Sequence, residues 1–236
     1  ERTDAIAKEA CAGLSGTDPE TIINEANKNL YEGASEEEIK EALILSSRSL
    51  VEAEPNYTYA TSRILLDGLR TEALSFLEIA PNATHEEMEK LYPKTLDAYI
   101  NKAIALELIN PELGKMDLKK LGKNLKPERD LMFSYLGLQT LYDRYFIHKD
   151  ETRFELPQIF FMRVAMGLAI GEEKREDRAI EFYNLLSSFD YMSSTPTLFN
   201  SGTIHSQLSS CYLTTVPDDL KGIYDALGDN LSLIHI

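Results

Sequence analysis

The sequence predicts a mainly α-helical fold with one short β segment near its C-terminal end. Apolar residues recur at helical spacing over most of residues 1–190, and capping-box patterns open three of these segments. From Ser193 onward the chain becomes rich in Ser, Thr, Pro and Gly, and residues 208–216 then have the β-branched and aromatic content of a strand. The 236 residues are enough for one or two domains with a substantial core.

Two helix starts lie near the N-terminus. Residues 17–20 combine a cap, a first-turn proline and a capping-box glutamate, and residues 35–38 repeat the capping-box form. Behind the second start, three apolar residues fall on one helical face, namely Ile39, Leu43 and Leu50. The stretch Glu54-Pro55-Asn56 predicts the end of that helix. Residues 59–77 predict the next helix, with an inward face made by Ile64, Leu65 and Leu69.

A turn at residues 81–84 predicts a soft domain boundary. Thr84 to Glu87 forms the third capping box, and residues 85–125 are helical, rich in Lys and interrupted. The interruptions are Pro93, Pro111 and Gly114. We therefore expect a first helical module over residues 1–80 and a helical connector over residues 81–126.

Three further helices are predicted before residue 190. Residues 127–147 predict one amphipathic helix, with one face formed by Leu131, Tyr135, Leu138, Leu141, Tyr142 and Tyr145. Pro157 opens a very apolar helix over residues 158–170, which Gly171 closes, and such a helix should be buried. Residues 178–189 are amphipathic again, through Ala179, Phe182, Leu186 and Phe189.

Composition excludes several classes of protein. The 24 basic and 39 acidic residues give a net charge of −15, which disfavours duplex nucleic acid as a partner but leaves room for a small nucleotide site. Apolar runs fall short of the roughly 20 residues that span a bilayer, so we expect no membrane association. The two cysteines, Cys11 and Cys211, form no CxxC or Cys/His cluster, which argues against zinc and suits a reducing cytosol.

Candidate chemistry is concentrated in residues 193–202 and 207–213. Small polar side chains beside a glycine can hold a phosphate or ribose through hydroxyls and backbone amides. Cys211 follows at the start of the expected strand, where a rigid backbone suits repeated redox work. The alternative is a surface loop followed by a buried structural cysteine, because a free cysteine is commonly a small core residue.

Four stretches of the sequence, taken in order, resemble the large subunit of class I ribonucleotide reductase. These are Pro55–Tyr59 with Arg63, Leu65 and Leu66; Pro127–Tyr135; Glu155–Gln158 with Phe161–Ala169; and Ser193–Thr203 with Gln207–Leu213. The resemblance covers most of residues 1–230, and the joint occurrence of these motifs is specific although each alone is weak. It implies an N-terminal region ahead of a ten-stranded α/β barrel, whose first strand is the expected β segment.

The resemblance also implies a function and its partners. The family reduces ribonucleoside diphosphates to 2′-deoxyribonucleoside diphosphates for DNA precursor synthesis, through a thiyl radical on a downstream cysteine. Cys211 matches the redox cysteine of the first barrel strand, which forms a disulfide with a second downstream cysteine. Thioredoxin or glutaredoxin resets that pair, and a separate small subunit with a metal cofactor supplies the radical. A homodimer is expected for the full-length protein, with ATP and deoxynucleotides as effectors and no metal in this chain.

Further site residues follow from the same resemblance. Thr197 and Ser210 match substrate-contacting positions, and the other reading of Thr197 is a turn hydroxyl. Asp218, Asp219 and Leu220 match the start of the family's specificity-effector site, although an Asp before a helix is also an ordinary N-cap. Cys11 has no motif behind it and is interpreted as a core residue.

Two departures from the family pattern affect these expectations. Residues 1–80 resemble an ATP-cone that lacks its leading hairpin, and Glu36 and Glu72 stand where lysine or threonine is expected, so we expect a degenerate cone. Residues 231–236 do not match the family and are interpreted as a truncated end, after the family region over 127–230. We therefore expect the chain alone to be inactive. Two other classes remain open: a non-catalytic helical nucleotide-binding regulatory module, and a helical protein-interaction domain in which Cys211 only packs.

Overall fold

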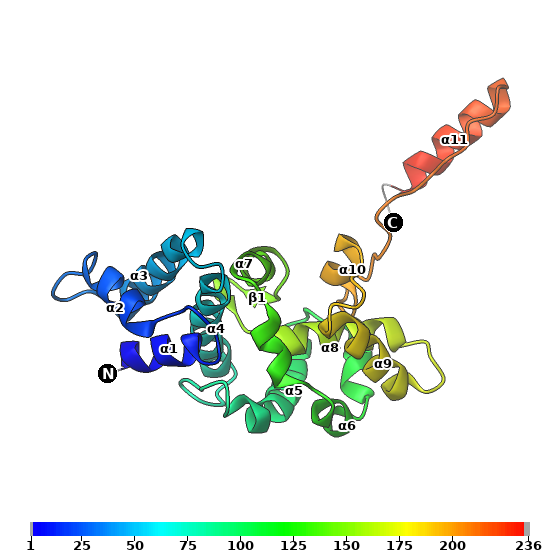
Figure 1. Cartoon of the computed structure of the whole chain (residues 1–236). Helices are drawn as coiled ribbons and strands as arrows, with labels where there is room; N and C mark the ends of the chain where they lie inside the picture. The colour runs from blue at the N-terminus through cyan, green and yellow to red at the C-terminus, as the bar shows by residue number, and fades with distance from the viewer. Residues whose placement is uncertain (1, 234–236) are drawn as a thin grey trace.

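The computed structural model describes residues 2–233, and helices dominate it (Figure 1). The elements in chain order are α1 (Arg2–Cys11), α2 (Pro19–Asn27), α3 (Glu36–Ser49), the 3-10 helix η1 (Leu50–Glu52), α4 (Tyr57–Phe76), α5 (Met88–Ala105), η2 (Pro111–Lys115), α6 (Leu118–Lys123), η3 (Pro127–Met132), α7 (Tyr135–Arg144), β1 (His148–Lys149), β2 (Thr152–Arg153), α8 (Pro157–Ala169), α9 (Arg175–Ser187), α10 (Thr195–Asn200) and α11 (Leu220–Leu233). The mainly helical fold class is therefore confirmed.

Helices α1 to α4 pack around a first core, with Cys11, Ile22, Leu43 and Ile64 among its buried members. The expected start of α2 is confirmed at Pro19, but the predicted capping box with Glu20 is wrong. The side chain of Asp18 caps the helix instead, because both of its carboxylate oxygens accept backbone N–H groups of the first turn.

The second predicted capping box is confirmed at the start of α3. The Glu38 backbone N–H donates to Ser35 Oγ at 3.2 Å, and the Ser35 backbone N–H donates to Glu38 Oε2 at 2.8 Å. The third box has the same reciprocal bonds, from Glu87 to Thr84 Oγ1 at 3.4 Å and from Thr84 to Glu87 Oε2 at 2.8 Å. The spacing therefore predicted the start of α3, whereas the third box precedes a turn and α5 begins after it, at Met88.

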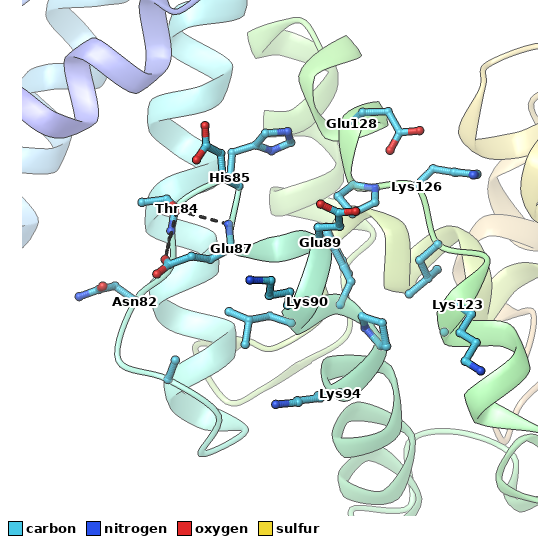
Figure 2. Close-up of a pocket in the computed structure, with 18 residues that line it drawn as sticks. Asn82, Thr84, His85, Glu87, Glu89, Lys90, Lys94, Lys123, Lys126 and Glu128 are labelled. Atoms are coloured by element: carbon cyan, nitrogen blue, oxygen red, sulfur yellow. Dashed lines mark hydrogen bonds between the residues drawn. The ribbon is translucent and has the colours of Figure 1, made fainter.

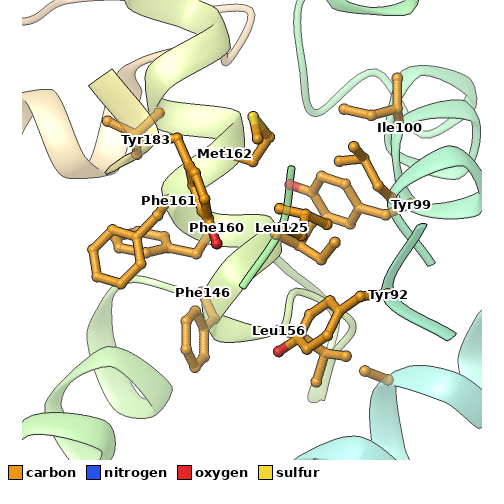
Figure 3. Packing of buried hydrophobic residues seen from close by; sticks show 14 of the residues in the cluster. Tyr92, Tyr99, Ile100, Leu125, Phe146, Leu156, Phe160, Phe161, Met162 and Tyr183 are labelled. Carbon is orange, nitrogen blue, oxygen red and sulfur yellow. The ribbon is translucent and has the colours of Figure 1, made fainter. Parts of the chain in front are cut away.

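A second and larger core joins α4, α5, α7, α8 and α9 and is rich in aromatic rings (Figure 3). Ring pairs inside it include Phe160 with Phe161 at 5.1 Å and Phe146 with Phe160 at 5.6 Å between centroids. As expected for an apolar helix, α8 is buried on nearly every side, and it packs along α9.

The prediction of one continuous helix over residues 127–147 is wrong. A 3-10 helix, η3, ends at Met132, Phe133 is extended, and α7 begins at Tyr135. Ser134 causes the break, because its backbone is extended and its Oγ accepts the Gly137 N–H at 3.3 Å as an N-cap. The inward face is nevertheless retained, since Leu138 is fully buried and its predicted neighbours are partly buried.

The prediction of a β segment at residues 208–216 is also wrong, because the structure has no strand at these residues. Within the described range, the only sheet is the two-stranded antiparallel pair β1–β2, with His148 opposite Arg153. A strand requires a partner for its backbone groups, and no backbone–backbone bond is made by residues 209–216 in the described chain.

The chain after α10 leaves the helical body, runs out as an extended segment and returns through α11 (Figure 1). Residues 209–221 are exposed, including Leu213 at 98%. Residues 231–233 of the tail interpreted as atypical continue α11, whereas residues 234–236 lie outside the described residues. Across residues 2–233, no helix is long and apolar enough to cross a membrane.

Candidate functional site

The loop expected to contact substrate folds into the short helix α10. Ser194 before it is extended, and Pro196 lies in its first turn, where the fixed φ of proline and its missing N–H are tolerated. The helix ends at Asn200, and Ser201 is its extended C-cap residue. Gly202 follows with φ of +77°, a left-handed conformation that favours glycine. Thr197 lies in the middle of α10 and is partly buried.

The guanidinium of Arg163, on α8, caps the C-terminal end of α10. Its Nη1 atom donates to three backbone carbonyl oxygens, those of Leu198 at 3.1 Å, Phe199 at 3.3 Å and Ser201 at 2.8 Å. The last carbonyls of a helix have no partner within the helix and carry its partial negative charge. Arg163 therefore satisfies these carbonyls with one cation, and we call this arrangement the Arg163 clamp.

Glu155 orients the arginine from the other side. Arg163 donates to it twice, from Nε to Oε1 at 2.9 Å and from Nη2 to Oε2 at 3.1 Å, and both side chains are fully buried. Tyr99 donates to Glu155 Oε1 at 2.6 Å, and the Ile147 N–H donates to Oε2 at 2.9 Å. Burial opposes the charge of Arg163, but Glu155 and Tyr99 together outweigh it and raise the pKa of the guanidinium.

Other contacts hold α10 against the helical body. Ser201 donates from Oγ to the Val164 carbonyl at 2.7 Å, and Gly167 of α8 leaves room for the backbone of Gly202. In addition, the ring of Tyr145 stacks on Phe199 with centroids 4.4 Å apart. The short helix is therefore anchored at both its carbonyl end and its side.

Thr197 and Asn200 tie α10 to the segment that leads to the cysteine. Thr197 Oγ1 donates to the Leu208 carbonyl at 3.3 Å, and Asn200 Nδ2 donates to the Gln207 carbonyl at 2.7 Å. Ser210 and Cys211 follow directly and are exposed. The structure thus joins Thr197 to the backbone just before Ser210, although no hydrogen bond links Thr197 to Cys211 within the described residues.

The two cysteines are free thiols in contrasting surroundings. Cys211 is exposed, which contradicts the alternative of a buried structural cysteine, and it lies on an extended segment instead of the expected strand. Cys11 is 8% exposed in the first core, which confirms its interpretation as a core residue. Burial is the main cause that raises the pKa of the Cys11 thiol.

The residues expected at the effector site lie at the start of α11. Asp219 accepts the Gly222 N–H on its side chain at 2.8 Å and the Ile223 N–H on its carbonyl at 3.0 Å, so it caps this helix. Asp218 and Leu220 flank it and are exposed. Helix α11 projects from the body, and its N-terminal end lies at the outer end of the projection (Figure 1).

Helices α1, α3 and α4 border a cavity of about 630 Å³, with contributions from α7 and β2. Glu36 lies at its edge, 3.7 Å from Arg2. Glu72 accepts the Tyr142 hydroxyl at 3.0 Å and the Arg153 backbone N–H at 2.6 Å. Glu72 therefore connects α4 to α7 and β2 and is already occupied by hydrogen bonds.

A larger cavity, of about 1480 Å³, lies between the start of α5 and the connection from α6 to η3 (Figure 2). Its charged lining mixes both signs: Lys90, Lys94, Lys123, Lys126, Glu86, Glu87, Glu89 and Glu128. None of the site residues expected from the sequence is in this lining.

Arg163 and Glu155 were missed as candidate site residues by sequence reasoning. A signal was present, because Arg163 is the one charged residue within the apolar stretch 158–170, and a buried arginine requires a partner. Spacing does not identify that partner, since Glu155 precedes the helix and the carbonyls come from residues about 35 positions later in the chain.

Comparisons with known proteins agree with the motifs. Residues 131–206 match the family described as "Ribonucleotide reductase, all-alpha domain". The chain is 47% identical over 218 residues to a ribonucleoside-diphosphate reductase subunit alpha of Chlamydia muridarum, covering 92% of this chain and 20% of that protein. A subunit alpha of Helicobacter pylori is 34% identical, over 93% of this chain and 26% of that protein. A large subunit of Vaccinia virus is 30% identical, over 93% and 28%. The chain thus spans between a fifth and just over a quarter of the length of these relatives.

Proposed function

The chain belongs to the ribonucleotide reductase large-subunit family, and on that premise we propose that it contributes a redox thiol and part of the substrate loop to a complete large subunit. The reaction proposed is the reduction of ribonucleoside diphosphates to 2′-deoxyribonucleoside diphosphates. Cys211 is the proposed redox thiol, and Thr197 and Ser210 are the proposed substrate contacts.

One observation carries this proposal beyond family membership. Helix α10 and the segment before Cys211 are fastened together by Thr197 and Asn200, so hydroxyl groups and an accessible thiol occur in one small region. Hydroxyls and backbone amides suit a diphosphate and a ribose, since they bind anions and sugar hydroxyls by neutral hydrogen bonds. An exposed thiol suits delivery of reducing equivalents and later reduction by another protein.

The proposed chemistry balances with two thiols. For each substrate, two cysteine thiols give up two electrons and two protons, the 2′-hydroxyl leaves as water, and the thiols become one disulfide. Cys211 supplies one thiol, and a cysteine elsewhere in the complete subunit supplies the other. A dithiol protein of the thioredoxin or glutaredoxin kind then reduces the disulfide by thiol exchange. The radical that starts the reaction is supplied by a small subunit with a metal cofactor.

Regulation by nucleotides is proposed to involve the start of α11. Asp218, Asp219 and Leu220 are the proposed specificity-effector contacts, with Asp219 also serving as the helix cap. A helix start has free N–H groups that can bind phosphate, so capping and effector contact are compatible at one place. The complete subunit is proposed to act as a homodimer.

Residues 1–80 are proposed to be a degenerate cone-like module. The cavity beside these residues is lined by five carboxylates, those of Glu36, Glu37, Asp67, Glu72 and Glu151, and by three cations, Arg2, Lys40 and Arg153, so its lining is net negative. A triphosphate would be repelled there. The cavity itself favours the second candidate function, a helical regulatory module that binds a small ligand without catalysis.

The test of the proposed function is Cys211→Ser in the complete large subunit with its small subunit. We expect loss of deoxynucleotide formation with the thermal unfolding midpoint unchanged, because an exposed side chain adds little to stability. Cys11→Ser is the matched control and should keep turnover while lowering the midpoint. Wild-type turnover by the Cys211→Ser enzyme would overturn the proposal, and loss of solubility in place of turnover would support the interaction-domain alternative.

A further inference from the structure

We propose that Arg163 is a positioning residue for the reductase reaction, acting on substrate through α10 and Thr197. The inference rests on the proposed function, because it assigns a role within the same site. Its basis is the Arg163 clamp: one fully buried guanidinium that holds three carbonyls at the end of a six-residue helix.

The nitrogen atoms of the Arg163 guanidinium have separate hydrogen-bond partners, and this separation supports a positioning role. Nε and Nη2 both donate to Glu155, which leaves Nη1 for the carbonyls of α10 alone. The planar fork of arginine fixes the angle between these two sets of bonds, so Glu155 sets the direction in which Nη1 points. Glu155 is itself fixed by Tyr99 and by the Ile147 N–H. The C-terminal end of α10 is thus held in a fixed position relative to α5, α8 and the chain before β1.

Packing alone does not require this arrangement. Burying an ion pair is seldom better for stability than burying apolar side chains of similar volume. The surrounding core is already apolar and aromatic, and Arg163 lies over the face of Phe160 at 5.2 Å. The ion pair instead fixes the orientation of α10. Three directional hydrogen bonds can select the orientation of a short helix, whereas apolar contacts cannot.

Displacement of α10 would be transmitted to the proposed site. Thr197 is one residue before the first clamped carbonyl, that of Leu198, and its own carbonyl accepts the Ser201 N–H at 3.0 Å. Thr197 and Asn200 in turn hold the carbonyls of Leu208 and Gln207. Loss of the clamp would therefore shift a proposed substrate contact and the start of the cysteine segment together, and a displacement of about 1 Å can cost on the order of 100-fold in rate.

The test compares Arg163→Lys with wild type in the complete enzyme, using two readouts. Lysine keeps the positive charge beside Glu155 but has no planar fork, so we expect KM for a ribonucleoside diphosphate to rise by roughly tenfold or more, with a smaller fall in kcat. We also expect faster hydrogen exchange at the Ser201 amide, which reports on α10 without any substrate.

Leu66→Ala is the control for general destabilisation, because Leu66 is 1% exposed in the same core but lies on α4. It should lower the unfolding midpoint and leave KM and the exchange of α10 unchanged. An equal rise of KM in Leu66→Ala, or a wild-type KM and exchange rate in Arg163→Lys, would overturn the positioning role.

A second variant keeps the test decisive if Arg163→Lys does not fold. Ser201→Ala removes only the bond from Oγ to the Val164 carbonyl and should raise KM by a few-fold, with faster exchange in α10. Wild-type behaviour of Ser201→Ala in both readouts would then count against the proposal. If the wild-type enzyme itself forms no deoxynucleotide, the proposed function fails, and the exchange measurement still decides whether Arg163 holds α10.

Discussion

The Tyr92 hydroxyl donates a 2.6 Å hydrogen bond to Oδ2 of Asp130 inside the larger core. Gln158 donates to the other carboxylate oxygen at 2.7 Å, and Tyr183 donates to Gln158 Oε1 at 2.6 Å. The network links α5, η3, α8 and α9 through neutral donors. Burial raises the pKa of the Asp130 carboxyl to about 6, and the bonds from Tyr92 and Gln158 oppose that rise without cancelling it.

Asp130 should therefore make stability depend on pH in a specific direction. The folded chain binds this proton more tightly than the unfolded chain, so the stabilisation is complete below the unfolded pKa of about 3.8 and is lost as pH rises through about 6. We expect the free energy of unfolding of wild type, relative to Asp130→Asn, to fall by about 3 kcal/mol in total from well below pH 3.8 to well above pH 6. Urea unfolding of both chains at several pH values measures this difference.

Asp150→Asn is the matched control for that measurement, because Asp150 lies exposed in the turn between β1 and β2. Its difference from wild type should not follow the same curve. A difference between wild type and Asp130→Asn that stays constant with pH would show that Asp130 is not protonated in this range.

The two cysteines should differ sharply in reactivity toward an alkylating reagent. Cys211 is exposed, whereas Cys11 is buried and burial raises the pKa of its thiol, so less of the reactive thiolate is present. Mass spectrometry of the native chain after a brief iodoacetamide pulse should find the label on Cys211. Labelling of Cys11 should require denaturant, and equal labelling of both residues in the native chain would contradict the burial of Cys11.

Gly167→Ala should destabilise the fold, because a Cβ at this position meets the backbone of Gly202. Backbone cannot move aside as a flexible side chain can, so we expect a loss of about 1–3 kcal/mol in the free energy of unfolding. Gly171→Ala is the matched control, since a Cβ there meets nothing within 4 Å. It should be neutral or slightly stabilising, and chemical denaturation of the two variants tests the contact between α8 and the end of α10.

The N-terminal cavity should bind ATP poorly. Titration calorimetry with Mg-ATP should give no saturable heat at submillimolar nucleotide, because the five carboxylates that line the cavity outnumber its three cations. Glu36→Lys changes an exposed side chain at its edge and should not unfold the chain. Tight ATP binding by the wild-type chain would refute the degenerate cone and favour a regulatory module.

Local signals sufficed for much of the helical fold. Ser35 with Glu38, Pro157 before an apolar run and Gly171 after it marked helix ends correctly, because caps, proline and glycine act within a few residues. The same local reasoning was wrong at Ser134, where the side chain capped a new helix inside an uninterrupted apolar pattern. Periodicity reports which face is apolar and does not show where the backbone changes direction.

The sequence by itself determined the helical class, the family and the presence of hydroxyl groups and a thiol between Thr197 and Cys211. Each of these depends on short runs of neighbouring residues. Only the tertiary structure decided that Cys211 lies exposed outside any strand, since a strand depends on a partner segment. It also decided that Arg163 joins Glu155 to the end of α10. Contacts between residues 155, 163 and 198–201 arise from the packing of α8 against α10, and no local pattern encodes which distant carbonyl a buried cation will meet.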